Sequence, residues 1–349
     1  MKKELFENIV RRIIEEKSVT GILIAKRENV RYITGFTGTM GYIYSDGENT
    51  IFLTDFRYVE QAEKECSGYK VERLEKGLVG WLTKRGTKKL GLEDWVTFGF
   101  VEELRREGIE VVPIGKPVEF LRAKKDISEI ELIKSALKIA EDAFVEVLSY
   151  IKDGVSEKDI ALELVYRMRQ KGAEKEAFEV IVASGERSSL PHGVASNRKL
   201  KMGDIVVIDF GANYLGYNSD VTRVVSLGTP REEVLKVYKA IINAMDEVMG
   251  SIANGKCAKE IHEVTCSVLD KYGYGKFFGH GTGHGVGLEV HEIPSISLLS
   301  KDVIEEGMVF TVEPGVYIPG EFGVRIEDMV YLGNEIEVLN NLKRDIVII

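Results

Sequence analysis

Two stretches of this chain, residues 202–227 and 307–332, follow the same pattern of apolar runs, glycines and acids. Each begins with a glycine before an apolar run that ends in an acid, turns, and places a second acid before another strand-like segment. The matching acids are Asp209 with Glu313 and Asp220 with Glu327. Short apolar runs bounded by turn residues are typical of strands, so the pattern predicts two related β-hairpins that face each other across a pseudo-twofold axis.

Such a duplication would gather the four carboxylates in one place at the ends of buried strands. Burying an uncompensated charge costs on the order of several kcal/mol per ion, so these acids need cations nearby. A single acid at a strand end is usually a turn or capping residue. Four acids at duplicated positions instead indicate a metal site.

A glycine-rich segment, residues 279–287, carries His280 and His284 between alternating glycines. Glycines at alternate positions would let a backbone approach a ligand closely. The segment lacks the ending of a phosphate loop and the spacing of a dinucleotide fingerprint, which argues against phosphate binding. Four carboxylates with one imidazole suit Mn, Fe(II) or Co and tolerate Zn. Two such cations about 3.5–4 Å apart activate water and polarise a carbonyl, so we expect hydrolytic chemistry.

Histidine provides a second indication, because the chain contains only five. Four of them lie in or beside the motif segments: His192, His280, His284 and His291. The fifth, His262, falls on a predicted helix beside Glu260 and Glu263, and we expect it to be a surface residue.

Composition excludes several classes of protein. At 349 residues and 44% hydrophobic, the chain is expected to form two domains. It contains no apolar run of the roughly 18–20 residues that a membrane span needs and no signal-peptide pattern, so we expect a soluble, cytoplasmic protein. A net charge of −9 argues against nucleic-acid binding, and three scattered cysteines are expected to be reduced. Scarce glutamine beside abundant Lys and Glu favours a thermophilic source.

The chain divides near residue 121. Helical and strand-like segments alternate before that point, which predicts an α/β domain. The charged stretch Arg122–Asp126 is interpreted as a linker, after which Ser128 and Glu131 form the capping-box pattern of a long helix. The second domain contains both acidic hairpins, so it is predicted to consist of two similar halves.

The motifs resemble those of the creatinase, prolidase and methionine aminopeptidase superfamily, the "pita-bread" metallopeptidases, and most closely its prolidase and aminopeptidase P branch. The resemblance covers nearly the whole chain. Its motifs are Leu190–Gly193, Val207–Gly211, Asn218–Arg223, Gly283–Gly287, Val290–Glu292, Val312–Gly315 and Val324–Asp328, with Asn29–Phe36 and Thr54–Tyr58 in the N-terminal part. The resemblance implies an α/β creatinase-like N-terminal domain, residues 1–121, and an α+β pita-bread catalytic domain with internal pseudo-twofold duplication, residues 122–349.

The same resemblance implies the role of each site residue. Asp209 would hold one metal, His284 and Glu313 the other, and Asp220 and Glu327 would bridge them. His192, His280 and His291 would line the substrate site, with His192, His291 and Glu313 acting in catalysis. Arg325 would contribute to the substrate site and brace the metal ligands from the strand face that it shares with Glu327, a placement that strand alternation supports independently.

The implied reaction is hydrolysis, by two divalent metal ions, of the peptide bond between an N-terminal residue and proline. Mn or Co is favoured, and Zn or Fe is compatible. An Xaa-Pro dipeptidase is favoured over an aminopeptidase P that acts on longer peptides. A metal-free enzyme of the creatinase kind and a non-enzymatic peptide-binding module are rivals, but the acidic ligand set is intact here. A homodimer is also implied. Segments such as Thr37–Gly41 are candidates for covering the groove, and a simple turn is the favoured alternative for any one of them.

Overall fold

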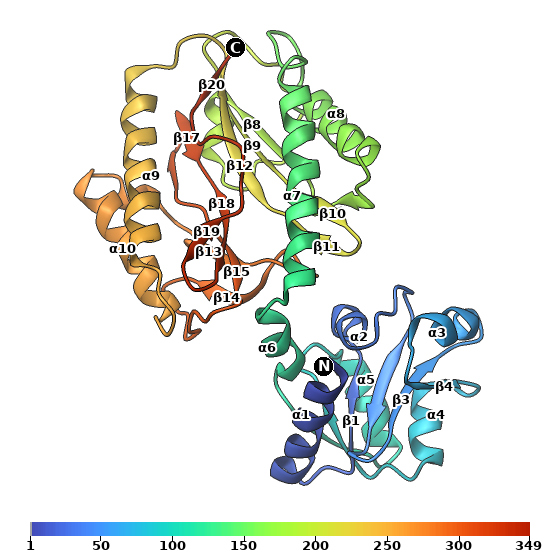
Figure 1. Ribbon diagram of the computed structural model, residues 1–349. Helices are drawn as coiled ribbons and strands as arrows, with labels where there is room; N and C mark the ends of the chain where they lie inside the picture. The colour runs from blue at the N-terminus through green and yellow to red at the C-terminus, as the bar shows by residue number, and fades with distance from the viewer. Residues whose placement is uncertain (1) are drawn as a thin grey trace. The chain divides into compact units, whose positions relative to one another are not determined.

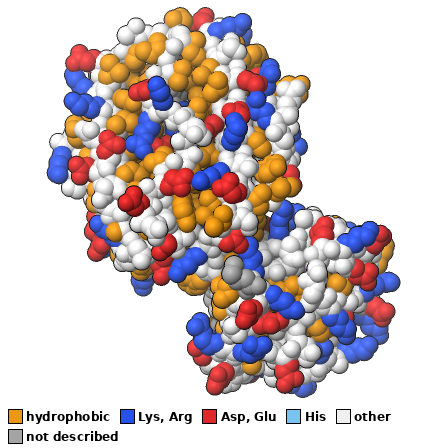
Figure 2. Space-filling model, in the orientation of Figure 1, with side chains coloured by type: hydrophobic (Ala, Val, Ile, Leu, Met, Phe, Trp, Pro, Cys, Tyr) orange, Lys and Arg blue, Asp and Glu red, His pale blue; other side chains and the backbone are white. Residues whose placement is uncertain are grey.

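A computed structural model describes residues 2–349. Its contacts separate two compact units, Met1–Arg122 and Ala123–Ile349 (Figure 1). Within the described residues, the helices are either too short or too polar to cross a membrane. On the face shown in Figure 2, basic and acidic side chains are interspersed over both units.

The first unit is built on one mixed six-stranded sheet with the order β4-β3-β2-β1-β5-β6. Its central strand β1 is buried along its whole length, as its apolar sequence requires. The strands are β1 (Gly21–Ile24), β2 (Tyr42–Ser45), β3 (Thr50–Thr54), β4 (Lys70–Arg73), β5 (Lys89–Leu92) and β6 (Glu110–Pro113). The helices are α1 (Lys2–Lys17), α2 (Arg27–Thr34), α3 (Val59–Glu65), α4 (Gly77–Lys84), α5 (Phe98–Arg106) and α6 (Pro117–Ala123), which ends at the boundary. The predicted α/β class is confirmed.

The second unit contains two helix pairs around several sheets, whose strands are antiparallel except for the last strand of the chain. The helices are α7 (Ile127–Val147), α8 (Glu157–Gln170), α9 (Glu232–Ser251) and α10 (Ala258–Lys271), with short 3-10 helices η1 (Gly185–Ser189) and η2 (Gly275–Phe277). The strands of its first half are β7 (Lys175–Glu176), β8 (Ile181–Ser184), β9 (Ile205–Phe210), β10 (Ala212–Tyr214), β11 (Tyr217–Asn218) and β12 (Val221–Ser226). Those of its second half are β13 (Gly283–Gly285), β14 (Glu292–Ile296), β15 (Val309–Val312), β16 (Gly315–Ile318), β17 (Phe322–Arg325), β18 (Asp328–Leu332) and β19 (Ile336–Val338), followed by β20 (Val347–Ile348).

The two acidic stretches form equivalent antiparallel pairs, β9 with β12 and β15 with β18. A backbone bridge between Thr222 and Glu327 joins the two pairs. In Figure 1 the pair α7 and α8 and the pair α9 and α10 lie on opposite sides of these strands. The predicted internal duplication is therefore confirmed, and it places the acid-bearing strand ends next to each other.

Helix α9 shows why the sequence folds against these strands. Its apolar residues recur every three or four positions, and that stripe is completely buried against β9, β12 and β17. The buried members include Val234, Val237, Ile241 and Met245. This packing fixes β9, β12 and β17, and Val248 at the end of α9 packs with residues of β15 and β18, so α9 contributes to the position of both hairpins.

Helix α7 begins two residues earlier than predicted. Asp126, not Ser128, is the N-cap: its side chain accepts a hydrogen bond from Glu129 N at 3.0 Å, and the Glu129 carboxylate accepts one from Asp126 N at 2.9 Å. Both spacings fit the capping-box pattern, so the local sequence alone was ambiguous. The Tyr217 hydroxyl donates to the buried Glu129 carboxylate, and this contact favours a helix that begins after Asp126.

The charged stretch 122–126 contains the boundary between the two units, as its interpretation as a linker requires, but two of its charges are buried. Arg122 is only 2% exposed and donates to Asn29 Oδ1 at 2.6 Å within the first unit. Lys125 is 6% exposed and pairs with Glu292 at 3.4 Å within the second unit. These charges are therefore paired inside the protein rather than solvated.

A buried ionic network supports the second acidic hairpin. Arg223 is 1% exposed and donates to Asp328 Oδ1 at 2.7 Å and to the carbonyl of Glu327. The other Asp328 oxygen accepts from Arg344 Nε at 2.6 Å. Arg344 also pairs at 3.1 Å with Asp246, whose side chain is 63% exposed.

This network generates a stability prediction. Asp328→Asn leaves buried Arg223 without its counter-charge, so we expect the free energy of unfolding to fall by about 3 kcal/mol or more. Asp246→Asn, which removes an exposed partner of the same network, should cost less than about 1 kcal/mol. Urea unfolding of both variants measures the difference. Equal effects would show that burial of the Arg223–Asp328 pair does not contribute to stability.

Candidate metal centre

The four duplicated acids meet at one cavity in the second unit. Asp209 lies near the end of β9 and Asp220 immediately before β12, while Glu313 directly follows β15 and Glu327 directly precedes β18. The cavity has a volume of about 490 Å³. All nine residues that the sequence nominated line it: His192, Asp209, Asp220, His280, His284, His291, Glu313, Arg325 and Glu327.

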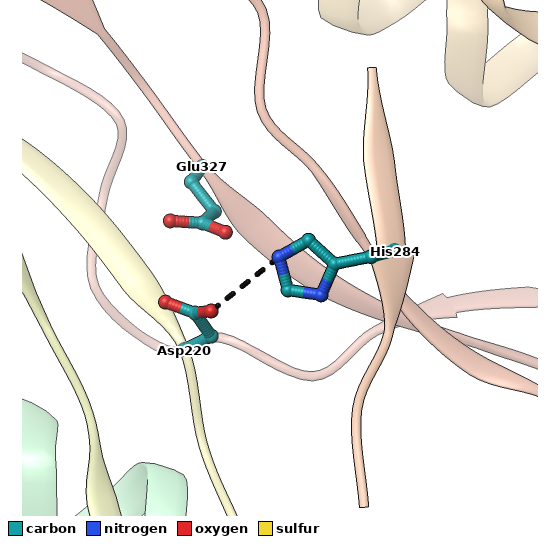
Figure 3. Close-up of side chains that lie close together, drawn as sticks. All are labelled: Asp220, His284 and Glu327. Atoms are coloured by element: carbon teal, nitrogen blue, oxygen red, sulfur yellow. Dashed lines mark ion pairs between the residues drawn. The ribbon is translucent and has the colours of Figure 1, made fainter. Parts of the chain in front are cut away.

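His284 lies between the acids of the two hairpins. Its Nε2 atom is 3.6 Å from Asp220 Oδ2 and 3.6 Å from Glu313 Oε1. Ligand-type atoms of Asp220, His284 and Glu327 all lie within 4.8 Å of one another. Figure 3 shows the imidazole and these two carboxylates pointing toward a common space.

The alternating glycines place His284 for a different reason from the one expected. A Cβ atom on Gly283 would lie 1.9 Å from the carbonyl oxygen of Thr311, and one on Gly285 would lie 2.3 Å from that of Ile293. Strand β13 therefore fits between β14 and β15 only because side chains are missing there. These two glycines make room for neighbouring strands rather than for a ligand, and they bring His284 to the cavity.

Burial and mutual repulsion disturb the proton affinity of the whole cluster. Burial raises the pKa of Glu313 to about 8. Burial, and then the negative charge of neighbouring acids, raises the pKa of Asp220 and of Glu327 well above the usual range. Burial also raises the pKa of Asp209 and lowers that of His284 to about 3. In the absence of cations, the cluster therefore favours protonated acids and a neutral imidazole.

Arg325 provides a fixed positive charge beside the acids. Its side chain is almost completely buried, and Nη2 donates to Asp209 Oδ2 at 2.6 Å. Its Nε donates to the hydroxyl of Thr222, which in turn donates to Glu327 Oε2 at 2.7 Å. Burial opposes the charge of Arg325, but Tyr317 and the nearby acids more than compensate and raise its pKa. Arg325 thus orients one acid from each hairpin.

The remaining hydrogen bonds of Arg325 extend this network along the cavity wall. Nη1 donates to the hydroxyl of Tyr317 at 2.8 Å and to the carbonyl of Pro191 at 3.0 Å. The Tyr317 hydroxyl lies 3.0 Å from His280 Nε2, and His280 Nδ1 lies 2.7 Å from the carbonyl of Gly281. That carbonyl can only accept, so Nδ1 carries the proton and Nε2 accepts from Tyr317. Burial lowers the pKa of His280 to about 4, which keeps the ring neutral.

The donor set fits divalent cations. Asp209 Oδ1 is buried and has no hydrogen-bond partner among the described residues. An orphaned carboxylate oxygen in a buried site is costly unless a cation completes its coordination. Oxygen-rich ligands with one neutral imidazole match hard to borderline divalent ions.

The other histidines occupy different settings. The rings of His291 and His284 have centroids 4.1 Å apart, so His291 lies directly beside the acids. His192 is exposed at the rim, in the segment that follows η1. His262 is buried, contrary to prediction: Nδ1 lies 3.0 Å from the hydroxyl of Thr282, on the segment that leads into β13. A helix position flanked by glutamates did not reveal this contact, which depends on how α10 packs.

Two contributors to the site were missed from the sequence. Thr222 lies two residues after Asp220, and strand alternation would have placed both on one face. Tyr317 follows Glu313 by four residues across a turn, and no local signal links it to His280. Only the pairing of β16 with β17 brings its hydroxyl to Arg325.

Comparison with known proteins adds independent evidence. Residues 131–334 match the model of metallopeptidase family M24, and residues 8–124 match that of the creatinase/prolidase N-terminal domain. An Xaa-Pro dipeptidase of Pyrococcus horikoshii is 40% identical over 336 residues, which cover 94% of this chain and 95% of that protein.

Solved structures agree over the whole chain. An Xaa-Pro dipeptidase from Bacillus anthracis has a TM-score of 0.95 and 39% identity, with 100% of both chains covered. An X-Pro aminopeptidase from Thermotoga maritima has a TM-score of 0.87 and 38% identity, covering 97% of this chain and 100% of that one. These likenesses confirm the predicted fold class and the resemblance inferred from the motifs. The chain belongs to metallopeptidase family M24, and its N-terminal part is a creatinase/prolidase N-terminal domain.

Proposed function

We propose that this chain is an Xaa-Pro dipeptidase that hydrolyses the peptide bond between an N-terminal residue and proline with two divalent cations. The observation that carries the proposal is the convergence of four buried acids and His284 on one cavity, with Asp209 Oδ1 left unpartnered. Names of relatives support the substrate class, since proteins similar over nearly the whole chain are called Xaa-Pro dipeptidases.

The proposed ligands follow the two hairpins. Asp209 would hold one cation, His284 and Glu313 would hold the other, and Asp220 and Glu327 would contribute to both. When bound, the cations polarise the scissile carbonyl and lower the pKa of water. We favour Mn or Co over Zn or Fe, because oxygen ligands predominate.

The chain's own residues carry out the remaining tasks. The Glu313 carboxylate takes the proton from the attacking water and passes it to the proline nitrogen as the peptide bond breaks. His291, beside His284, donates a hydrogen bond to the oxygen on which negative charge develops. His192 and His280 line the substrate on the far side; both ring nitrogens of His280 are already hydrogen-bonded within the protein, so it contributes the face of its ring. We assign Arg325 to bracing Asp209 and, through Thr222, Glu327; the substrate contact predicted for it stays a prediction.

An aminopeptidase P that accepts longer Xaa-Pro peptides is the alternative, and a structure at 38% identity bears the name X-Pro aminopeptidase. We place the domain boundary after residue 121, close to where the two family matches meet between residues 124 and 131. The homodimer, the cytoplasmic location and the thermophilic source stay predictions.

Removal of the cations should make stability depend on pH. Without cations, folded acids such as Glu313, with a pKa of about 8, keep protons that the unfolded chain releases near 4.5, so stability falls as the pH rises between those values. The buried histidines, whose pKa values are lowered, have the opposite effect on stability, but only below pH 6.5. Chelated protein should therefore melt at a lower temperature at pH 8 than at pH 6.5, and added Mn should remove most of that difference. A chelated protein with the same midpoint at both values would contradict the repulsion among the acids.

Glu313→Gln tests the proton-transfer role. The amide preserves shape but cannot accept and deliver the proton, so kcat should fall by about 100-fold or more in protein shown to retain its bound metal, with far-UV circular dichroism unchanged. Glu321→Gln, at an exposed turn between β16 and β17, is the matched control and should retain activity. Near-normal turnover by Glu313→Gln would overturn the assignment.

Substrate length separates the two peptidase functions. We expect the Mn-loaded enzyme to have a higher kcat/KM on an Xaa-Pro dipeptide than on the same sequence extended by one residue beyond proline. The opposite ratio would identify an aminopeptidase P. Cleavage of neither peptide, in protein shown to contain bound metal, would overturn the proposed activity.

A further inference from the structure

A completely buried carboxylate lies at the start of α8, outside the cavity. Glu157 has no solvent exposure, and one of its oxygens accepts from Ser184 N at 2.8 Å and Ser184 Oγ at 2.6 Å. The other accepts from Ser196 N at 3.0 Å, Ser196 Oγ at 2.6 Å and Arg187 Nε at 3.1 Å. A buried anion with this many donors holds them in one arrangement, because any donor that moved away would lose its partner.

These donors bracket the segment that carries His192. Arg187 lies in η1 before the segment, and its Nη2 reaches across to the carbonyl of Val194 at 2.7 Å. Val194 N in turn donates to the carbonyl of His192 at 2.8 Å. Ser196 follows two residues later. Glu157 therefore holds the backbone on both sides of His192 through two separate connections.

His192 needs this support because its own ring has none. The side chain is exposed at the cavity rim, and no described residue hydrogen-bonds the imidazole. Residues 190–198 contain no helix or strand, only one isolated bridge, from Val194 to Ile181. On the cavity side, Arg325 donates to the carbonyl of Pro191 in this segment. The contacts of Glu157 hold the segment from outside the cavity.

We propose that Glu157 is a positioning residue for the peptidase reaction, which acts by holding the segment around Ser196 and Arg187 so that the His192 ring faces the substrate. The inference rests on the proposed function, which assigns His192 to substrate binding. Negative charge is required, since Arg187 and the two serines all present donors to it. A glutamine amide would direct its own N–H groups at one of these donors and release one side of the segment.

A double-mutant cycle tests the proposal on the Mn-loaded enzyme with an Xaa-Pro dipeptide. Glu157→Gln should lower kcat/KM by about tenfold or more, whereas in a His192→Ala background the same substitution should change it by less than about twofold. Equal losses in both backgrounds would show a general structural effect and overturn the proposal. Glu163→Gln, on the same helix and in a partly exposed pair with Arg167, is the matched control and should leave kcat/KM unchanged.

A milder variant keeps the test valid if Glu157→Gln folds poorly. Ser196→Ala removes the hydroxyl contacts with Glu157 and with Arg198 N but keeps the bond from Ser196 N to Glu157. It should lower kcat/KM by about two- to fivefold, again only when His192 is present. A loss that persists in the His192→Ala background would overturn the proposal.

Amide hydrogen exchange gives a readout that does not depend on activity. In Glu157→Gln, amides of residues 190–196 should exchange faster than in the unsubstituted protein, while those of β9 should not change. Unaltered exchange in that segment would overturn the positioning role. If the unsubstituted enzyme fails to cleave Xaa-Pro peptides, the proposed function fails, and the exchange experiment still decides whether Glu157 holds the segment.

Discussion

The site depends on the buried guanidinium of Arg325. It provides a permanent positive charge beside four acids that would otherwise repel one another in a medium of low dielectric constant. Its rigid fork reaches Asp209 directly and Glu327 through Thr222, so the two hairpins share one brace. A lysine could not reproduce this, because its single ammonium group cannot donate in several fixed directions. The same group also orders the histidine side of the cavity through Tyr317.

One arginine cannot neutralise four carboxylates. The raised pKa values of the acids show that the cluster is unfavourable without further positive charge, and the unpartnered Asp209 oxygen marks where it is needed. Bound cations would therefore stabilise the folded chain. Two features outside the cavity stabilise the hairpins: α9 packs against β9, β12 and β17, and the Arg223–Asp328 pair anchors the second hairpin. These contacts outside the cavity stabilise the fold, so the acids in the cavity can be arranged to bind cations.

Several predictions from local sequence failed for one reason: neighbours distant in the chain changed the meaning of a residue. The capping pattern was present twice, and a tyrosine nearly ninety residues away favoured Asp126 over Ser128. Lys125 was expected to be solvated within a charged linker, but its side chain is buried and pairs with Glu292. His262 lay among glutamates on its helix but is buried against Thr282. Charge and periodicity describe one element, whereas burial depends on what packs against it.

The duplication, the set of acids and histidines and the class of fold could all be predicted from the sequence, because strand periodicity and repeated acids are visible without any knowledge of packing. Tertiary structure alone decided how those residues cooperate. Thr222, Tyr317 and Glu157 act through hydrogen bonds between segments far apart in the chain, and no spacing rule predicts such contacts. Ligand identity follows from local chemistry, but ligand orientation follows from contacts that exist only after the two hairpins and the segment around His192 have packed together.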